Sequence, residues 1–169
     1  QHFRPNAQQR RALRRLSRQV NRSPKASIAS TILIEDAHPV ELPGDLADAW
    51  VAPAEDGAIC TYIPDPVGGY GASCATQEDL QAGGAITVLG GTGELRDQAV
   101  VVVVVPDGGD APVVTDPSGA EESPPIEGIG ATVVSEESSV SVGDVSLTIP
   151  AFEPVCEAAV DAEFRRCAF

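Results

Sequence analysis

Hydrophobic residues after position 26 fall into short runs that are separated by turn residues. The runs are rich in Val and Ile, which suit pleated strands better than helices. Between them lie many of the chain's 16 Gly and 14 Pro residues. We predict strands at 27–34, 50–53, 58–63, 72–75, 85–89, 100–105, 113–115, 131–134 and 140–149, of which 113–115 is expected at an edge and 140–149 has a turn or bulge at Gly143-Asp144. Residues 64–71 and 116–128 are expected to be loops. The predicted fold class is therefore mostly β: an antiparallel, β-sandwich-like body.

One of these runs stands out because no polar residue interrupts it. Val100–Val105 is a stretch of consecutive valines, and an unbroken apolar run of this length is typical of a strand that is buried on both faces. We expect it to form the centre of the core. The whole apolar run, Ala99–Val105, is about a third of the roughly 20 residues that a membrane-spanning helix needs, so no such span is predicted.

Three segments have the pattern of a helix. Residues 7–20 place Leu13, Leu16 and Val20 on one narrow apolar stripe, which indicates an amphipathic basic helix. Residues 76–80 have a capping-box pattern, with Thr76 as the cap and Asp79 as its partner. Residues 153–166 are predicted to close the chain as a short helix, with Pro154 in its first turn.

Charge divides the chain into two parts. Residues 1–25 hold eight basic residues and no acidic one, whereas residues 26–169 hold three basic residues and all 25 carboxylates. The formal charges are +8 and −22, in agreement with the net −14. We predict a basic N-terminal arm at 1–25 and an acidic β-rich domain at 26–169 that includes the helix at 153–166.

The arm is the best candidate for a binding surface. Its predicted interface residues are Arg10, Arg11, Leu13, Arg14, Arg15, Leu16, Arg18 and Val20. Opposite charges on two parts of one chain favour head-to-tail association between copies, and the strand at 27–34 could add to the edge of a neighbouring sheet. An anionic lipid or cell-envelope polymer is an alternative partner for the arm. A further alternative is that the arm is a linker that binds no partner. Nucleic acid is not expected, because the acidic domain repels phosphates.

Four cysteines, an even number without the spacing of a metal site, predict two disulfides and a secreted or cell-surface protein. Cys60 and Cys74 flank a loop rich in Pro and Gly, and a hairpin there would bring them together. Cys156 and Cys167 would lie about 16 Å apart in an unbroken helix. Either the helix is shorter and these two form a pair, which we favour, or they pair with Cys60 and Cys74.

Part of the chain resembles a known group of sequences. The motifs are Trp50-Val-Ala-Pro, Asp56-Gly-Ala-Ile-Cys60, Gly68-Gly-Tyr-Gly-Ala-Ser-Cys74-Ala and Val104-Val-Pro-Asp-Gly108. Over residues 40–115 they resemble uncharacterised secreted or membrane-anchored proteins of GC-rich actinobacteria, with a Cys pair around a Gly-rich loop and a "VPDG" turn. The resemblance implies an extracellular location and a Cys60–Cys74 pair, and implies no activity. The start at Gln1 agrees with a removed secretory signal.

The sequence predicts no catalytic residue, no cofactor and no metal ligand. His38 precedes Pro39 in a turn and would need a distant Ser or carboxylate beside it to act in a hydrolase. Adjacent carboxylates such as Glu35-Asp36 are abundant, and pairs of this kind are typical of solvated turns. Asp107, Asp110 and Asp116 offer oxygen ligands for Ca²⁺ without the spacing of an EF-hand.

We therefore expect a non-enzymatic secreted or cell-surface structural protein that assembles with other copies of itself, as a filament or another homo-oligomer. The first alternative is a monomeric extracellular ligand-binding module. The second is a hydrolase built around His38.

Overall fold

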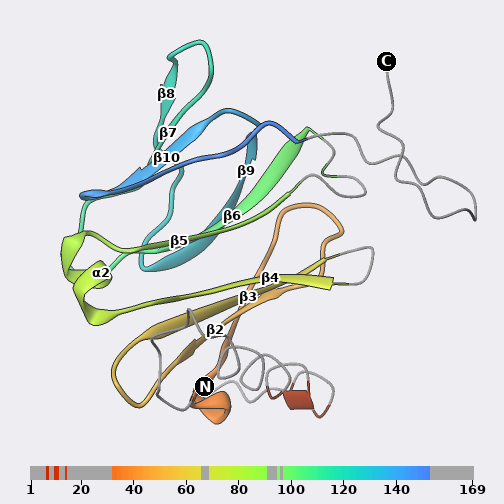
Figure 1. The fold of residues 1–169 in the computed structure, drawn as a ribbon, viewed down its shortest axis with the longest axis vertical. Helices are drawn as coiled ribbons and strands as arrows, with labels where there is room; N and C mark the ends of the chain where they lie inside the picture. Colours follow the sequence, from red (N-terminus) through yellow and green to blue (C-terminus); the bar gives the residue numbers. More distant parts are fainter. Residues whose placement is uncertain are drawn as a thin grey trace, which may run out of the picture.

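The computed structural model describes residues 32–65, 69–90, 95 and 97–152, together with Ala7, Arg10, Arg11 and Arg14. Strands dominate this part of the chain, and every strand pairing in it is antiparallel. They form three sheets, which are stacked in Figure 1. The prediction of a mostly antiparallel β fold is confirmed.

The first sheet is a meander of consecutive strands in the order β1-β2-β3-β4. Its strands are β1 (His38–Val40), β2 (Ala49–Pro53), β3 (Ile59–Asp65) and β4 (Gly69–Ala75). A short 3₁₀ helix, η1 (Ile34–Asp36), precedes β1, and Ile32 forms an isolated bridge with Ala54. The predicted strand at 27–34 is therefore interrupted at Ile34, and its residues 27–31 lie outside the described part of the chain.

A short α-helix connects the first sheet to the middle sheet. Helix α2 (Gln77–Ala82) has Thr76 as its N-cap, and the Thr76 hydroxyl accepts a hydrogen bond from the Asp79 N–H while Asp79 bonds the Thr76 N–H. This reciprocal capping box confirms the prediction from the sequence. Gly83 and Gly84, both with positive φ, then end the helix beside the turn at Gly143.

The middle sheet has three strands in the order β5-β6-β9, and the third sheet has four in the order β11-β10-β7-β8. The middle strands are β5 (Ala85–Gly90), β6 (Gln98–Val104) and β9 (Ile129–Ser135); the third sheet contains β7 (Val113–Thr115), β8 (Glu121–Glu122), β10 (Ser139–Val142) and β11 (Val145–Thr148). Strands β10 and β11 form a hairpin around Gly143-Asp144, so the turn or bulge predicted there is a turn that divides 140–149 into two strands.

Two hydrophobic cores lie on the two faces of the middle sheet. Val100, Val102 and Val104 of β6 pack with residues of the first sheet, such as Val51 and Ile63. The alternate positions Val101 and Val103 pack with Val140 and Val142 of the third sheet. Because successive side chains of a strand point to opposite faces, one uninterrupted valine run supplies both cores.

Those valines are almost fully removed from solvent. The residues Val100, Val101 and Val103 are 0 % exposed, and Val102 is 1 % exposed. Burial of a valine side chain contributes on the order of 1.5–3 kcal/mol relative to an exposed one. The prediction that this run is buried on both faces and central to the core is confirmed.

The hairpin around the Gly-rich segment differs from its prediction. Residues 64–71 were expected to be a loop, but β3 continues through Pro64 and β4 begins at Gly69, with Pro64 opposite Tyr70. Pro64 lacks an N–H. Backbone bonds at position 64 would be made on the side of β2. The residue of that chain segment opposite Pro64 comes before Ala49, the first residue of β2, so no ladder hydrogen bond is lost.

Two further details correct the sequence analysis. Strand β7 was expected at an edge, but it lies between β10 and β8. The segment 116–128 was expected to be a loop throughout, yet Glu121–Glu122 forms the short outer strand β8. The predicted helix at 153–166 lies outside the described residues, as does most of the predicted helix at 7–20, so both stay predictions.

Candidate interaction surface

The side of the first sheet that faces away from the middle sheet carries a third apolar cluster. We call this cluster the outer face, and its buried members are Ile32, Ala37, Trp50, Ala52 and Cys60. Ala49 and Val51 alternate with them along β2 and point to the inner core. Trp50, the one tryptophan of the chain, is 4 % exposed. The outer face is therefore not an open apolar surface in the folded chain.

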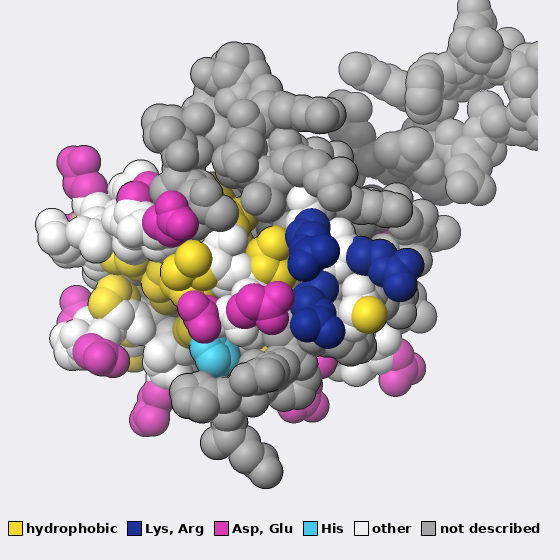
Figure 2. Space-filling model, turned by 90° about the horizontal axis from the view of Figure 1, so that it is seen from below, with side chains coloured by type: hydrophobic (Ala, Val, Ile, Leu, Met, Phe, Trp, Pro, Cys, Tyr) yellow, Lys and Arg dark blue, Asp and Glu magenta, His cyan; other side chains and the backbone are white. Residues whose placement is uncertain are grey.

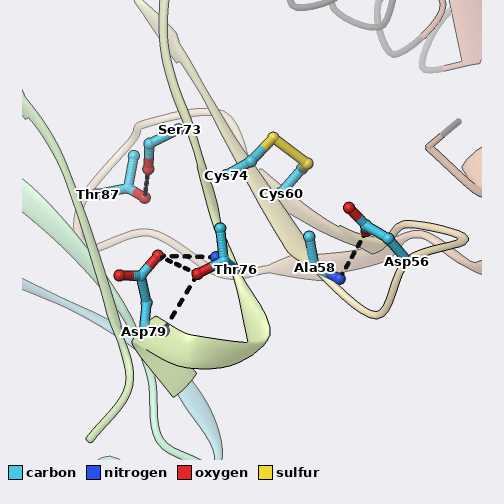
Figure 3. Close-up of a disulfide and its surroundings, with 8 residues drawn as sticks. All are labelled: Asp56, Ala58, Cys60, Ser73, Cys74, Thr76, Asp79 and Thr87. Atoms are coloured by element: carbon cyan, nitrogen blue, oxygen red, sulfur yellow. Dashed lines mark hydrogen bonds between the residues drawn. A yellow bond between two sulfur atoms is a disulfide. The ribbon is translucent and has the colours of Figure 1, made fainter. Parts of the chain in front are cut away.

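A disulfide joins two strands of this sheet. Cys60 of β3 and Cys74 of β4 are directly opposite in register, with a Cα–Cα distance of 4.0 Å. Figure 3 shows the bond across the two strands, next to the Thr76 cap and the Asp56 turn. Since the bridge closes the hairpin, it constrains the unfolded chain as well as the sheet. The predicted Cys60–Cys74 pair is confirmed, while Cys156 and Cys167 lie outside the described residues.

The arm meets the acidic domain next to the outer face. The Arg10 guanidinium lies 3.7 Å from the Glu35 carboxylate of the same chain, with 40 % and 63 % of the two side chains exposed. Glu35 belongs to η1, which begins at Ile34 and is followed by Ala37, and both of these residues pack in the apolar cluster. Figure 2 shows arginine side chains (dark blue) gathered on one part of this view, beside Asp and Glu side chains (magenta).

An exposed pair of this kind contributes about 0–1 kcal/mol, because solvent screens the charges and the long side chains lose entropy. One such contact cannot hold an arm in place. The contact shows instead at which place on the domain the arm meets a carboxylate.

The remaining predicted interface residues are less well placed. Arg11 and Arg14 are described and exposed. Leu13, Arg15, Leu16, Arg18 and Val20 lie outside the described part of the chain. Sequence reasoning did not single out Glu35, which it grouped with Asp36 as a solvated turn. The charge division indicated that a carboxylate would contact the arm, but it did not indicate which carboxylate.

The histidine considered for a hydrolase is at the surface. His38 opens β1 opposite Val51 and is exposed. Among the described residues, no hydrogen bond joins it to a Ser hydroxyl or to a carboxylate. The hydrolase alternative required a buried His38, and this side chain is exposed.

The adjacent carboxylates serve local structure where their contacts are known. Asp79 completes the cap of α2, and Asp56 accepts a hydrogen bond from the Ala58 N–H at 2.9 Å within a turn. Glu136 accepts one from the Phe152 N–H at 3.0 Å. Within the described ranges, no group of three or more His, Cys, Asp or Glu side chains could hold a metal ion.

Asp116, one of the carboxylates considered for Ca²⁺, organises its own loop. It accepts hydrogen bonds from the Ser118 hydroxyl, the Ala120 N–H and the Ser118 N–H. These bonds, that of the Ser118 hydroxyl first, favour the ionised form and lower the pKa of Asp116. The carboxylate is thus used to close the turn between β7 and β8.

Comparison of the chain with protein-family models, with curated proteins and with solved structures found no match. The resemblance to secreted actinobacterial proteins therefore stays a prediction. The described part of the chain contains no helix that is long and apolar enough to span a membrane. The disulfide is compatible with an extracellular location, because such bonds persist in oxidising compartments.

Proposed function

We propose that the protein is a non-enzymatic, secreted or cell-surface structural subunit with a β-sandwich-like body, which associates with other copies of itself through its basic arm. The observation that carries the proposal is the charge division, +8 over residues 1–25 and −22 over the remainder. Two acidic domains repel each other, and an arm of opposite charge that lies on a neighbour reduces this repulsion.

The contact between Arg10 and Glu35 supplies the geometry of the proposal. Within one chain it joins the arm to the border of the outer face. In an assembly, the same contact forms between the arm of one copy and the domain of the next, which is the exchange that characterises domain swapping. The 17 residues at positions 15–31 could span about 60 Å when extended, so their length permits the exchange.

A chain lacking residues 1–25 tests the proposal. At about 20 mM salt, where the Debye length exceeds about 20 Å, we expect the full chain to sediment as oligomers and the shortened chain as a monomer. Within the full chain, Arg10, Arg11 and Arg14 changed together to Gln should weaken the oligomer, and the matched triple change to Lys should preserve it. Equal oligomeric states for the full and shortened chains would refute the proposal.

The first alternative, a monomeric extracellular ligand-binding module, also has an observation in its favour. Arg10 pairs with Glu35 of its own chain, and an arm that stays on its own domain leaves the protein monomeric. Concentration separates the two functions. Assembly grows with protein concentration at low salt, whereas an arm closed on its own chain gives a single sedimentation coefficient at every concentration.

A further inference from the structure

The middle sheet ends in a strand whose outer edge has no partner in the described part of the chain. Strand β9 pairs with β6 along its whole length. Two backbone bonds beyond the strand ends, from Glu136 N to Asp97 O and from Val105 N to Gly128 O, fix the phase of the ladder. Because antiparallel bonding alternates, the even-numbered residues of β9 exchange their backbone bonds with β6.

The odd-numbered residues of β9 consequently direct their N–H and C=O groups away from the sheet. Ser135 uses its C=O to accept a bond from the Ser138 N–H. Nowhere in the described ranges do the outward groups of Ile129, Ala131 and Val133 have a hydrogen-bond partner. A row of unpaired backbone groups of this kind is a template for the addition of a strand.

Most other edge strands of the three sheets have features that disfavour the addition of a further strand. Strand β1 has Pro39 at the centre of its three residues, and the ladder phase places it outward, where it offers no donor. Strand β8 is two glutamates long. Strand β11 is only four residues long, and two of them are the exposed polar residues Ser146 and Thr148. At the opposite end of the middle sheet, β5 is flanked by strands of both outer sheets, β4 and β11. Strand β9 has seven residues without charge or proline.

We propose that β9 pairs with β9 of a second copy about a two-fold axis at Ala131, which joins the two middle sheets into one continuous sheet. In this antiparallel register Ala131 faces Ala131 of the other copy, and Ile129 faces Val133. Each outward N–H then meets an outward C=O, giving about six hydrogen bonds. Ala131 and Val133 pack on the core shared with the first sheet, so Ile129 lies on that side of the sheet too.

The occupant is a second copy because the edge is complementary to itself in both length and chemistry. Ile129 is one of two large hydrophobic residues of the described chain that remain exposed, at 40 %, and its partner in the proposed register is another apolar residue. The small Ala131 lies at the axis, where two identical side chains must meet.

Charge makes this interface respond to salt in the opposite direction from the arm. Glu127 and Glu136 flank β9. The two-fold axis brings Glu127 of each copy close to Glu136 of the other copy. Added salt screens this repulsion and strengthens the β9 pair, whereas it weakens an arm held by opposite charges. The β9 pair does not depend on the arm, so either proposal can fail alone.

The experiment compares two substitutions in the full chain at about 1 M NaCl, where screening acts beyond about 3 Å. Ile129→Lys places a charge at the proposed edge. Leu147→Lys is its matched control, because Leu147 is 39 % exposed and lies on β11. We expect the unchanged chain and Leu147→Lys to form dimers of equal affinity, and Ile129→Lys to dissociate at least about tenfold more readily.

Hydrogen exchange of individual amides supplies the second readout. As dimers form, the amides of Ile129, Ala131 and Val133 should become protected, while the amide of Ser146 on the β11 edge should not change. A monomer at about 1 M NaCl over the whole concentration range overturns the proposal. So does a dimer that Ile129→Lys and Leu147→Lys form equally well.

Discussion

The middle sheet and the first sheet are stabilised in different ways. Strand β6 of the middle sheet is buried on both faces among apolar side chains alone. The first sheet buries one face in the same core, but it also carries a disulfide, a capped helix at its exit and a charged contact beside its outer face. A strand between two sheets is thus stabilised by apolar side chains, whereas the first sheet, which lies outermost, also uses covalent and polar contacts.

Removal of the disulfide should have the largest effect. The double substitution Cys60→Ala and Cys74→Ala opens a 15-residue loop in the first sheet, which costs about 3 kcal/mol in the free energy of unfolding. Urea unfolding, followed by the fluorescence of Trp50 in the same sheet, measures the loss. A loss well under about 1 kcal/mol would mean that the first sheet does not depend on its covalent bond.

The valines of β6 test the other side of the comparison. Val101→Ala and Val102→Ala each remove a buried side chain, the first from the core with the third sheet and the second from the core with the first sheet. We expect each to lower the free energy of unfolding by about 2 kcal/mol. The two variants serve as controls for each other, because a strand buried on one face only would give one large and one small loss.

The cap of α2 tests whether the two regions unfold together. Thr76→Ala removes the hydroxyl that accepts the Asp79 N–H, which should cost about 1 kcal/mol. Gln81→Ala, an exposed change in the same helix, is the control and should have almost no effect. If the sheets unfold as one unit, Trp50 fluorescence and far-ultraviolet circular dichroism report the same shift; separate transitions would show that the connection is weak.

The smallest effect belongs to the loop of the third sheet, away from both regions. The pKa of Asp116 is lowered in the folded chain, so its ionised form stabilises the fold above the pKa of the unfolded state, and this contribution disappears as the pH falls through the folded pKa. Asp116→Asn should therefore unfold more readily than the unchanged chain at about pH 7. The difference should shrink in acid; a difference independent of pH would contradict this account.

Local patterns in the sequence predicted the local features of the fold. The valine run, the turn signals, the capping box and the hairpin that brings Cys60 to Cys74 each depend on residues close in the chain or on period-2 patterning. They were found for that reason. Strand β8 was missed because two glutamates carry no strand signal of their own and pair only through β7.

Features that depend on distant residues could not be predicted in the same way. The contact of Arg10 with Glu35 needs the path of the chain between them, and charge alone gave only the sign of the partner. The free edge of β9 follows from the strand order of the middle sheet, which no single segment encodes. The interface predicted for Leu13, Leu16 and Val20 stays a prediction.

The central claim is that the arm lies on the acidic domain of another copy, and an amine at the contact itself allows a direct test. Lys25 is the one lysine of the chain, and the double substitution Arg10→Lys and Lys25→Arg moves it to the position that meets Glu35, where a zero-length carbodiimide can join it to a carboxylate. In a mixture of ¹⁴N and ¹⁵N chains of this variant at low salt, the account predicts peptides that link position 10 of one isotope to a carboxylate of the other. Links confined to chains of a single isotope would show that the arm folds back on its own domain, and would contradict the proposed assembly.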